Sequence, residues 1–219
     1  MAAKYLTPCV HPALLICAML VCGCNDKSES ESPTPVKSEW RDMGTPHKEA
    51  RPSDETAKPV SLITEMTLRD SAMRGEIEIV RQAIKQGVEV DAIDEKGRTA
   101  LLLASCDGHT DVVQLLLESD AHINHRNFDG STALMFAASG ANHETVRMLL
   151  KAGADADVVD KGEGFTALMY AAAEGQAEVV RVLLRHDADV TVRDKDGDTA
   201  ADFAKQNGHI EVTRLLEAR

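Results

Sequence analysis

Three histidines are the residues of this 219-residue chain that come nearest, by type and spacing, to a metal site. His122 and His125 are separated by two residues, and His143 follows further along the chain. Two imidazole rings can hold a transition metal when a third ligand completes the site. No third ligand stands at a characteristic spacing. We therefore interpret these histidines as solvated side chains and expect no bound metal.

The sequence offers no other catalytic constellation. It contains no GxGxxG, P-loop, HExxH or GxSxG pattern. Cys106 has no His/Asp pattern around it that would activate a thiol, so we interpret it as a partly buried small residue. We expect a protein without enzymatic activity or cofactor. A hydrolase or metal protein built on the histidine pair is the weakest alternative.

Composition and charge limit the possible fold classes and the possible classes of ligand. Aromatic residues make up only 3% of the chain, so the core must come from Ala, Leu, Val and Ile, which suits stacked helices. The formal net charge is −12, of which residues 61–219 carry −11. Such a domain repels phosphate backbones and anionic lipid surfaces. We expect no nucleic-acid ligand, and the overall charge favours a partner with a basic patch.

Residues 1–23 have the pattern of a signal peptide, with an apolar run at 13–21 that is shorter than the ~20 residues a membrane-spanning helix needs. The following Val21-Cys22-Gly23-Cys24 resembles the lipobox of bacterial lipoproteins. The resemblance implies cleavage before Cys24 and lipidation of its thiol, with the lipid as the only membrane attachment. Asn25 then weakly favours the outer membrane. An ordinary signal peptide, giving a secreted or soluble periplasmic protein, is the alternative.

Residues 24–60 are rich in Ser, Glu, Pro and Lys, and Trp40 is their only aromatic residue. They show no apolar periodicity, so they cannot bury enough surface to offset the entropy of ordering. We expect a disordered tether with a root-mean-square span of ~30–36 Å.

Residues 64–219 repeat themselves. Thr99, Thr132, Thr166 and Thr199 each follow a Gly-X pair and precede Ala, at intervals of 33, 34 and 33 residues. Each Thr is followed five residues later by Ala and nine residues later by Gly or Ala, and then by a Val/Leu stripe. A Thr at a helix start can cap free N–H groups, and the apolar stripe can be buried between neighbouring units.

This pattern resembles the ankyrin-repeat consensus closely. The resemblance implies an all-α solenoid of about five helix–turn–helix units with hairpin fingers, in which His109 and His209 are structural. The first unit has Met66 at the Thr position, and the last carries Asp202 and Lys205 on its first helix, so we expect both to act as caps. The extra residue of the second interval falls in 160–164, where we expect a tolerated loop insertion.

The ankyrin resemblance also implies a binding surface, formed by the finger tips and the exposed face of the first helices. Carried over position by position, it predicts partner-binding finger residues Glu95, Lys96, Arg98, Phe128, Asp129, Ser131, Glu163, Phe165, Lys195, Asp196 and Asp198. On the helix face it predicts Asp107, Ser139 and Glu174.

Phe128 and Phe165 are two of only four phenylalanines, and both fall at finger positions that usually face solvent. Exposed aromatic residues are frequent interface anchors, whereas local packing against a neighbouring finger is the alternative. Phe136, Tyr170 and Phe203 all lie four residues after a repeat Thr, which predicts a packing column.

Together these features favour a lipid-anchored scaffold in a bacterial envelope, whose monomeric repeat domain binds another protein. An inhibitor or immunity-type protein that blocks an enzyme by one-to-one binding is the alternative. The ankyrin fold alone does not fix the partner.

Overall fold

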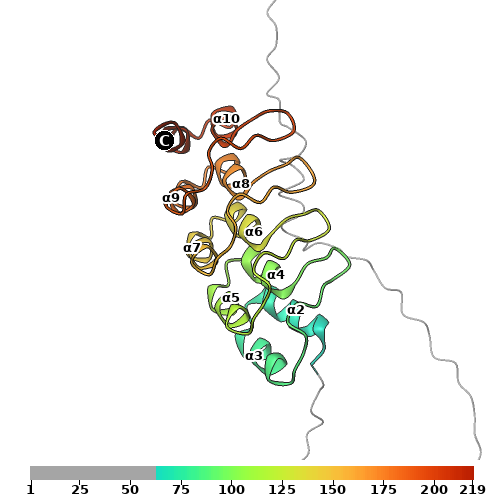
Figure 1. Ribbon diagram of the computed structural model, residues 1–219. Coiled ribbons are helices and arrows are strands. Elements are labelled where there is room, and N and C mark those ends of the chain that lie inside the picture. Colours follow the sequence, from blue (N-terminus) through green and yellow to red (C-terminus); the bar gives the residue numbers. More distant parts are fainter. Residues whose placement is uncertain (1–62) are drawn as a thin grey trace, which may run out of the picture.

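The computed structural model describes residues 63–219, so the predicted signal peptide, Cys24 and the tether lie outside the described residues. The described part contains ten helices and no strands, in five consecutive pairs (Figure 1). The first helices of the pairs are α2 (Glu65–Arg74), α4 (Ala100–Cys106), α6 (Ala133–Ser139), α8 (Ala167–Ala173) and α10 (Ala200–Gln206). The second helices are α3 (Ile77–Lys85), α5 (Thr110–Leu117), α7 (His143–Lys151), α9 (Ala177–Arg185) and α11 (Ile210–Glu217).

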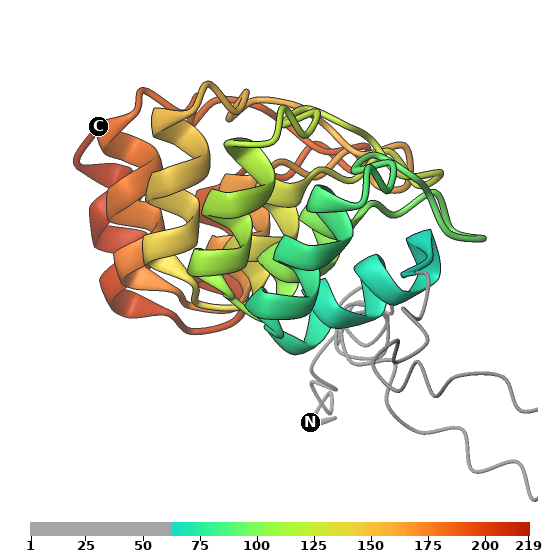
Figure 2. The same ribbon diagram turned by 90° about the horizontal axis from the view of Figure 1, so that it is seen from below.

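The pairs stack into a solenoid, which confirms the expected fold class. The first helices form one row, the second helices form a parallel row, and the loops between pairs project from the other side of the first helices (Figures 1 and 2). Within residues 63–219 no helix is long and apolar enough to cross a membrane.

Threonine hydroxyls start the first helices, as the repeat pattern predicts. In three units the hydroxyl of Thr99, Thr132 or Thr166 accepts the N–H three residues further on. Thr199 and Asp202 form a reciprocal capping box in the last unit.

The first unit departs from this register. Its cap is Thr64, two positions before Met66, and α2 has 10 residues where the other first helices have 7. Met66 therefore lies inside the helix, where it is 65% exposed.

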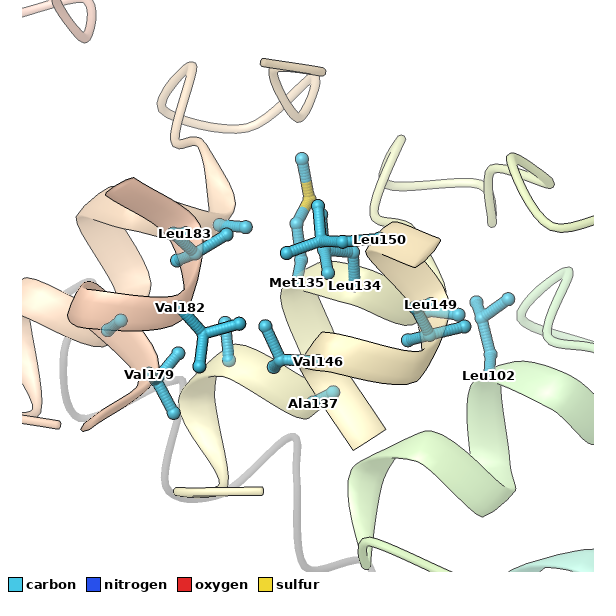
Figure 3. Close-up of a cluster of buried hydrophobic side chains, with 14 of the residues drawn as sticks. Leu102, Leu134, Met135, Ala137, Val146, Leu149, Leu150, Val179, Val182 and Leu183 are labelled. Atoms are coloured by element: carbon cyan, nitrogen blue, oxygen red, sulfur yellow. The ribbon is translucent and has the colours of Figure 1, made fainter. Parts of the chain in front are cut away.

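The core is made of small and branched side chains, as the low aromatic content requires. Ala137 on α6 is fully buried, so neighbouring first helices can approach closely. Leu149 on α7 and Leu183 on α9 are also fully buried and belong to the stripe between units (Figure 3). Each such leucine contributes roughly 1.5–3 kcal/mol of hydrophobic stabilisation.

Polar side chains at the start of the second helices join consecutive units. The Nε2 atoms of His109 and His209 lie 2.9 Å from the carbonyl oxygens of Met73 and Ala173, at the ends of the preceding first helices. In the third unit Asn142 takes this role and donates to the Cys106 carbonyl at 2.8 Å. The histidines of the repeat consensus are therefore structural, as predicted.

Candidate functional site

Four loops between helix pairs form the fingers, here numbered 1 to 4: residues 86–99, 118–132, 152–166 and 186–199. Backbone hydrogen bonds join each tip to the next. The N–H of Phe128 donates to the Lys96 carbonyl at 3.2 Å, that of Lys161 to Asp129 at 2.8 Å, and that of Lys195 to Glu163 at 2.9 Å. The tips are therefore one continuous row and not four independent loops.

Finger 3 contains the extra residue, and the hydrogen bonds locate it. In finger 2, Phe128 donates its N–H to finger 1, and the next residue, Asp129, accepts a hydrogen bond from finger 3 through its carbonyl. In finger 3 the corresponding residues, Lys161 and Glu163, are separated by Gly162. The extra residue is thus accommodated at the exposed tip, and the hydrogen-bonded row passes around it.

An acidic or amide side chain holds each turn from inside. Asp94 accepts the backbone N–H groups of Lys96 at 2.9 Å and Arg98 at 2.8 Å, and pairs with the Arg98 guanidinium at 2.7 Å. Burial raises the pKa of the Asp94 carboxyl, but the hydrogen bonds from Arg98 and Lys96 outweigh it and hold the pKa below its usual 3.8. Asn127, Asp160 and Asp194 accept backbone N–H groups in the same way.

The structure exposes many of the predicted binding residues. Those exposed are Glu95, Lys96, Asp107, Phe128, Asp129, Glu174, Lys195 and Asp196. Those partly buried are Arg98, Ser131, Ser139, Glu163 and Asp198. Arg98 is committed to Asp94 in its own turn, so it contributes to the finger's shape more than to a free surface.

Phe165 is buried, so the prediction that it faces solvent is wrong. Its side chain is 9% exposed and makes edge-to-face contacts with Tyr170, at a ring-centroid distance of 5.6 Å, and with Phe203 at 5.0 Å. The Tyr170 hydroxyl donates to Asp160 at 2.8 Å, and Asp160 also accepts the N–H of Phe165. Phe165 thus packs between Tyr170 of unit 4 and Phe203 of unit 5. These ring contacts run through Phe165 and do not form the predicted column of Phe136, Tyr170 and Phe203.

Phe128 differs from Phe165. It is 59% exposed at the tip of finger 2. One side of its ring lies against Gly97 of finger 1, where an added Cβ would come 2.7 Å from a ring carbon. Its carbonyl accepts a hydrogen bond from the Lys161 ammonium of finger 3 at 3.3 Å. Neighbouring fingers therefore fix the ring's base while most of its surface is open to solvent.

The structure adds four exposed finger residues that the sequence analysis missed. Each directly precedes the acidic or amide residue of its turn; they are Ile93, Arg126, Val159 and Arg193. Ile93 is 46% exposed and Val159 is 39% exposed. A large aliphatic residue next to an otherwise polar turn, as at Ile93 and Val159, is the feature of the sequence that could have identified this position.

The paired histidines do not converge on a common point. His122 pairs through Nδ1 with the Asp91 carboxylate at 2.5 Å, whereas Nε2 of His125 lies 2.8 Å from the Gly97 carbonyl. Both contacts join finger 2 to finger 1. Within residues 63–219 no group of three or more His, Cys, Asp or Glu side chains could hold a metal ion.

The bases of the fingers carry acidic side chains without balancing cations. Residues 86–92, 118–125, 152–158 and 186–192 contain eight acidic side chains and no Lys or Arg. Some of these carboxylates join neighbouring units, because Asp91 accepts the N–H of His122 at 3.0 Å and Asp157 accepts that of Asp189 at 2.8 Å. The tips, in contrast, carry both signs of charge.

Comparison with known families agrees with this architecture. A family model described as ankyrin repeats (3 copies) matches residues 68–160 and 134–218, which together span more than half of the chain. The chain belongs to the ankyrin-repeat family. Ankyrin repeats indicate a scaffold for protein–protein interaction, and proteins of this family are generally non-enzymatic.

Proposed function

We propose that this protein is anchored through a lipid on Cys24 in a bacterial envelope and binds a protein partner there. The binding surface consists of the finger tips and the adjoining exposed face of the first helices. The observation that carries the binding proposal is the exposure of Phe128 on a tip whose backbone is hydrogen-bonded to both neighbouring fingers.

Rigid presentation favours this surface over other parts of the domain. Inter-finger hydrogen bonds and the turn carboxylates already order the tips before a partner arrives. A preorganised surface loses little conformational entropy on binding, so more of the contact energy contributes to affinity. Aromatic side chains held in this way are frequent centres of interfaces.

The anchor proposal rests on the sequence. Val21-Cys22-Gly23-Cys24 supports acylation of Cys24, and the composition of residues 24–60 supports a tether. A tether with a span of ~30–36 Å would let the repeat domain reach partners near the membrane without contacting the bilayer.

Site-specific photo-crosslinking in cells tests the binding surface. A photoreactive phenylalanine analogue is placed at Phe128 and, as a control, at Gln114, which is exposed on α5. We expect a discrete protein adduct from position 128 and none from position 114. No adduct, or the same adduct from both positions, would refute the binding surface.

Intact mass measurement and membrane fractionation of wild type and Cys24→Ala test the anchor in a bacterium that processes lipoproteins. We expect the wild type to begin at Cys24, carry acyl mass and sediment with membranes. We expect none of these three results for the variant. An unacylated, soluble wild type would remove the anchor and leave the repeat domain's binding role intact.

A further inference from the structure

The positions on either side of the turn residue of each finger form a surface that we call the finger row. Three of its members are apolar and exposed: Ile93, Phe128 and Val159. Four are cationic and exposed: Arg126, Lys161, Arg193 and Lys195. Glu95 is the only acidic member, so the finger row carries a net charge of +3 within a domain of −11.

The members of the finger row are contiguous. The Lys161 ammonium reaches the Phe128 carbonyl at 3.3 Å, and the Lys195 ammonium reaches the Lys161 carbonyl at 3.1 Å. Arg126 extends from finger 2 to the Val159 carbonyl of finger 3. Arg126 and Lys161 therefore lie beside Val159 and Phe128, and Lys195 continues the row from finger 3 to finger 4.

The tips carry further charges immediately beside the finger row. The second tip position carries Asp129, Glu163 and Asp196 in fingers 2 to 4, with Lys96 in finger 1. Charges more than ~8–10 Å apart are largely screened in salt, so contact-range charges decide which ligand docks. Arg126 and Lys161 donate to the carbonyls of Val159 and Phe128, so each of these apolar residues has a cation in direct contact with its backbone. Asp129 also lies next to Phe128 in the chain, but the exposed charged side chains of the four tips, five cationic and three acidic, sum to +2.

We propose that the partner presents an acidic segment with interspersed apolar side chains. Its apolar groups pack beside Phe128, Ile93 and Val159, and its carboxylates pair with Arg126, Lys161 and Lys195. This inference rests on the proposed function and reverses the sign that the overall charge of the domain suggests for the partner. The reversal arises because the eight acidic side chains at the finger bases have no Lys or Arg among them, whereas cations outnumber acids among the exposed charged side chains of the tips.

An anionic lipid surface also combines negative charge with apolar groups. A broad anionic surface would also meet the exposed acidic side chains Glu95, Asp129 and Asp196 of the same tips. A single acidic chain can follow the finger row without bringing negative charge against the finger bases. We therefore assign the finger row to a protein segment, with vesicle binding as the competing outcome.

Fluorescence anisotropy with defined probes tests the assignment. The protein is the full chain carrying Cys24→Ala, which prevents acylation. The first probe is a labelled peptide in which Asp-Glu pairs alternate with Leu-Phe pairs. In two control peptides Lys replaces every acidic residue, or Ala replaces every apolar residue. Vesicles of phosphatidylcholine with phosphatidylglycerol are the lipid probe.

We expect saturable binding of the acidic apolar peptide alone, weakened by raising the salt concentration. Phe128→Ala and the double variant Lys161→Glu/Lys195→Glu should each weaken it at least tenfold. The matched control Lys85→Glu/Lys151→Glu makes the same charge change on exposed ends of α3 and α7, and should stay within twofold of the parent. Circular dichroism verifies that each variant is folded.

Four results would overturn the assignment: no saturable binding of the acidic peptide, equal or tighter binding of the Lys peptide, binding of vesicles in place of the peptide, or indifference to Lys161→Glu/Lys195→Glu. The crosslink at position 128 distinguishes an error in the partner's chemistry from an error in the location of the binding surface. If that crosslink persists while the peptide result fails, the partner chemistry is wrong and the binding surface stands. If the crosslink is absent, the proposed function itself fails.

Discussion

Replacing Phe165 by Ala should destabilise the repeat domain strongly. The ring is 9% exposed and contacts Tyr170 of its own unit and Phe203 of the next. The substitution leaves a cavity between units 4 and 5, with two aromatic rings facing it. Because each unit of a solenoid is stabilised mainly by its neighbours, the loss falls on the last unit in particular.

The magnitude follows from the burial. Truncating a buried Phe to Ala typically costs ~3–5 kcal/mol, because hydrophobic transfer energy is lost and a cavity remains. Edge-to-face aromatic pairs contribute ~0.5–1.5 kcal/mol each beyond their buried area. The site lies near the surface and can partly collapse, so we expect a loss of about 3 kcal/mol. Phe136→Ala is the matched control, since Phe136 is only partly buried, and should cost ~1–2 kcal/mol.

Urea unfolding followed by circular dichroism measures both variants. A decrease in the m-value for Phe165→Ala would show that the last unit unfolds separately, because m scales with the surface exposed. A loss below ~1 kcal/mol, or a loss no greater than that of Phe136→Ala, would refute the packing role. Loss of the crosslink at position 128 in the Phe165→Ala variant, with stability unchanged, would also refute the packing role. Phe165 would then belong to the binding surface.

For three further substitutions the structure predicts whether the stability of the domain, or its loss in acid, rises or falls. Ala141 adopts φ 60°, so Ala141→Gly should raise the unfolding free energy by ~1 kcal/mol, and a lower urea midpoint would contradict this. Tyr170→Phe removes the hydroxyl that donates to buried Asp160 at 2.8 Å and should cost ~1.5–3 kcal/mol in the same assay; a neutral result would show that solvent replaces it. The Thr199 hydroxyl and N–H hold the pKa of Asp202 below its usual 3.8, so this stabilisation is present above pH ~4 and lost as pH falls through the folded value. Asp202→Asn should therefore reduce the loss of stability on acidification in pH-dependent melting, and an unchanged acid slope would contradict the assignment.

The fold was predictable because the repeat pattern combines independent signals in one register. A Thr that can cap, an Ala that permits close packing and a Val/Leu stripe recur together, so each unit supports the others. Thr64 was missed because the first unit lacks the Gly-X-Thr sequence and its helix begins earlier. Cap position depends on where the chain enters the unit, which the repeat interval alone does not specify.

The binding surface was only partly predictable. Finger positions can be aligned from the sequence, and Phe128 is exposed as expected for an anchor. Phe165 stands between the Gly and the Thr of its unit, and the equivalent Arg98, Ser131 and Asp198 are partly buried as well, so this position of the finger faces the repeats more than solvent. Ile93 and Val159 were missed because apolar residues next to a turn can equally belong to the core.

Gly162 gives finger 3 a property that the other fingers lack. It lies between Lys161, whose N–H donates to finger 2, and Glu163, whose carbonyl accepts from finger 4, so neither backbone hydrogen bond between fingers depends on it. Its own carbonyl accepts only the flexible Lys195 ammonium of finger 4, a side chain that also reaches the Lys161 carbonyl. Added chain length at this point would leave the register of the solenoid unchanged, because only an exposed tip is extended. Finger 3 is therefore the place where a reporter peptide or a recognition loop could be grafted without altering how the units stack.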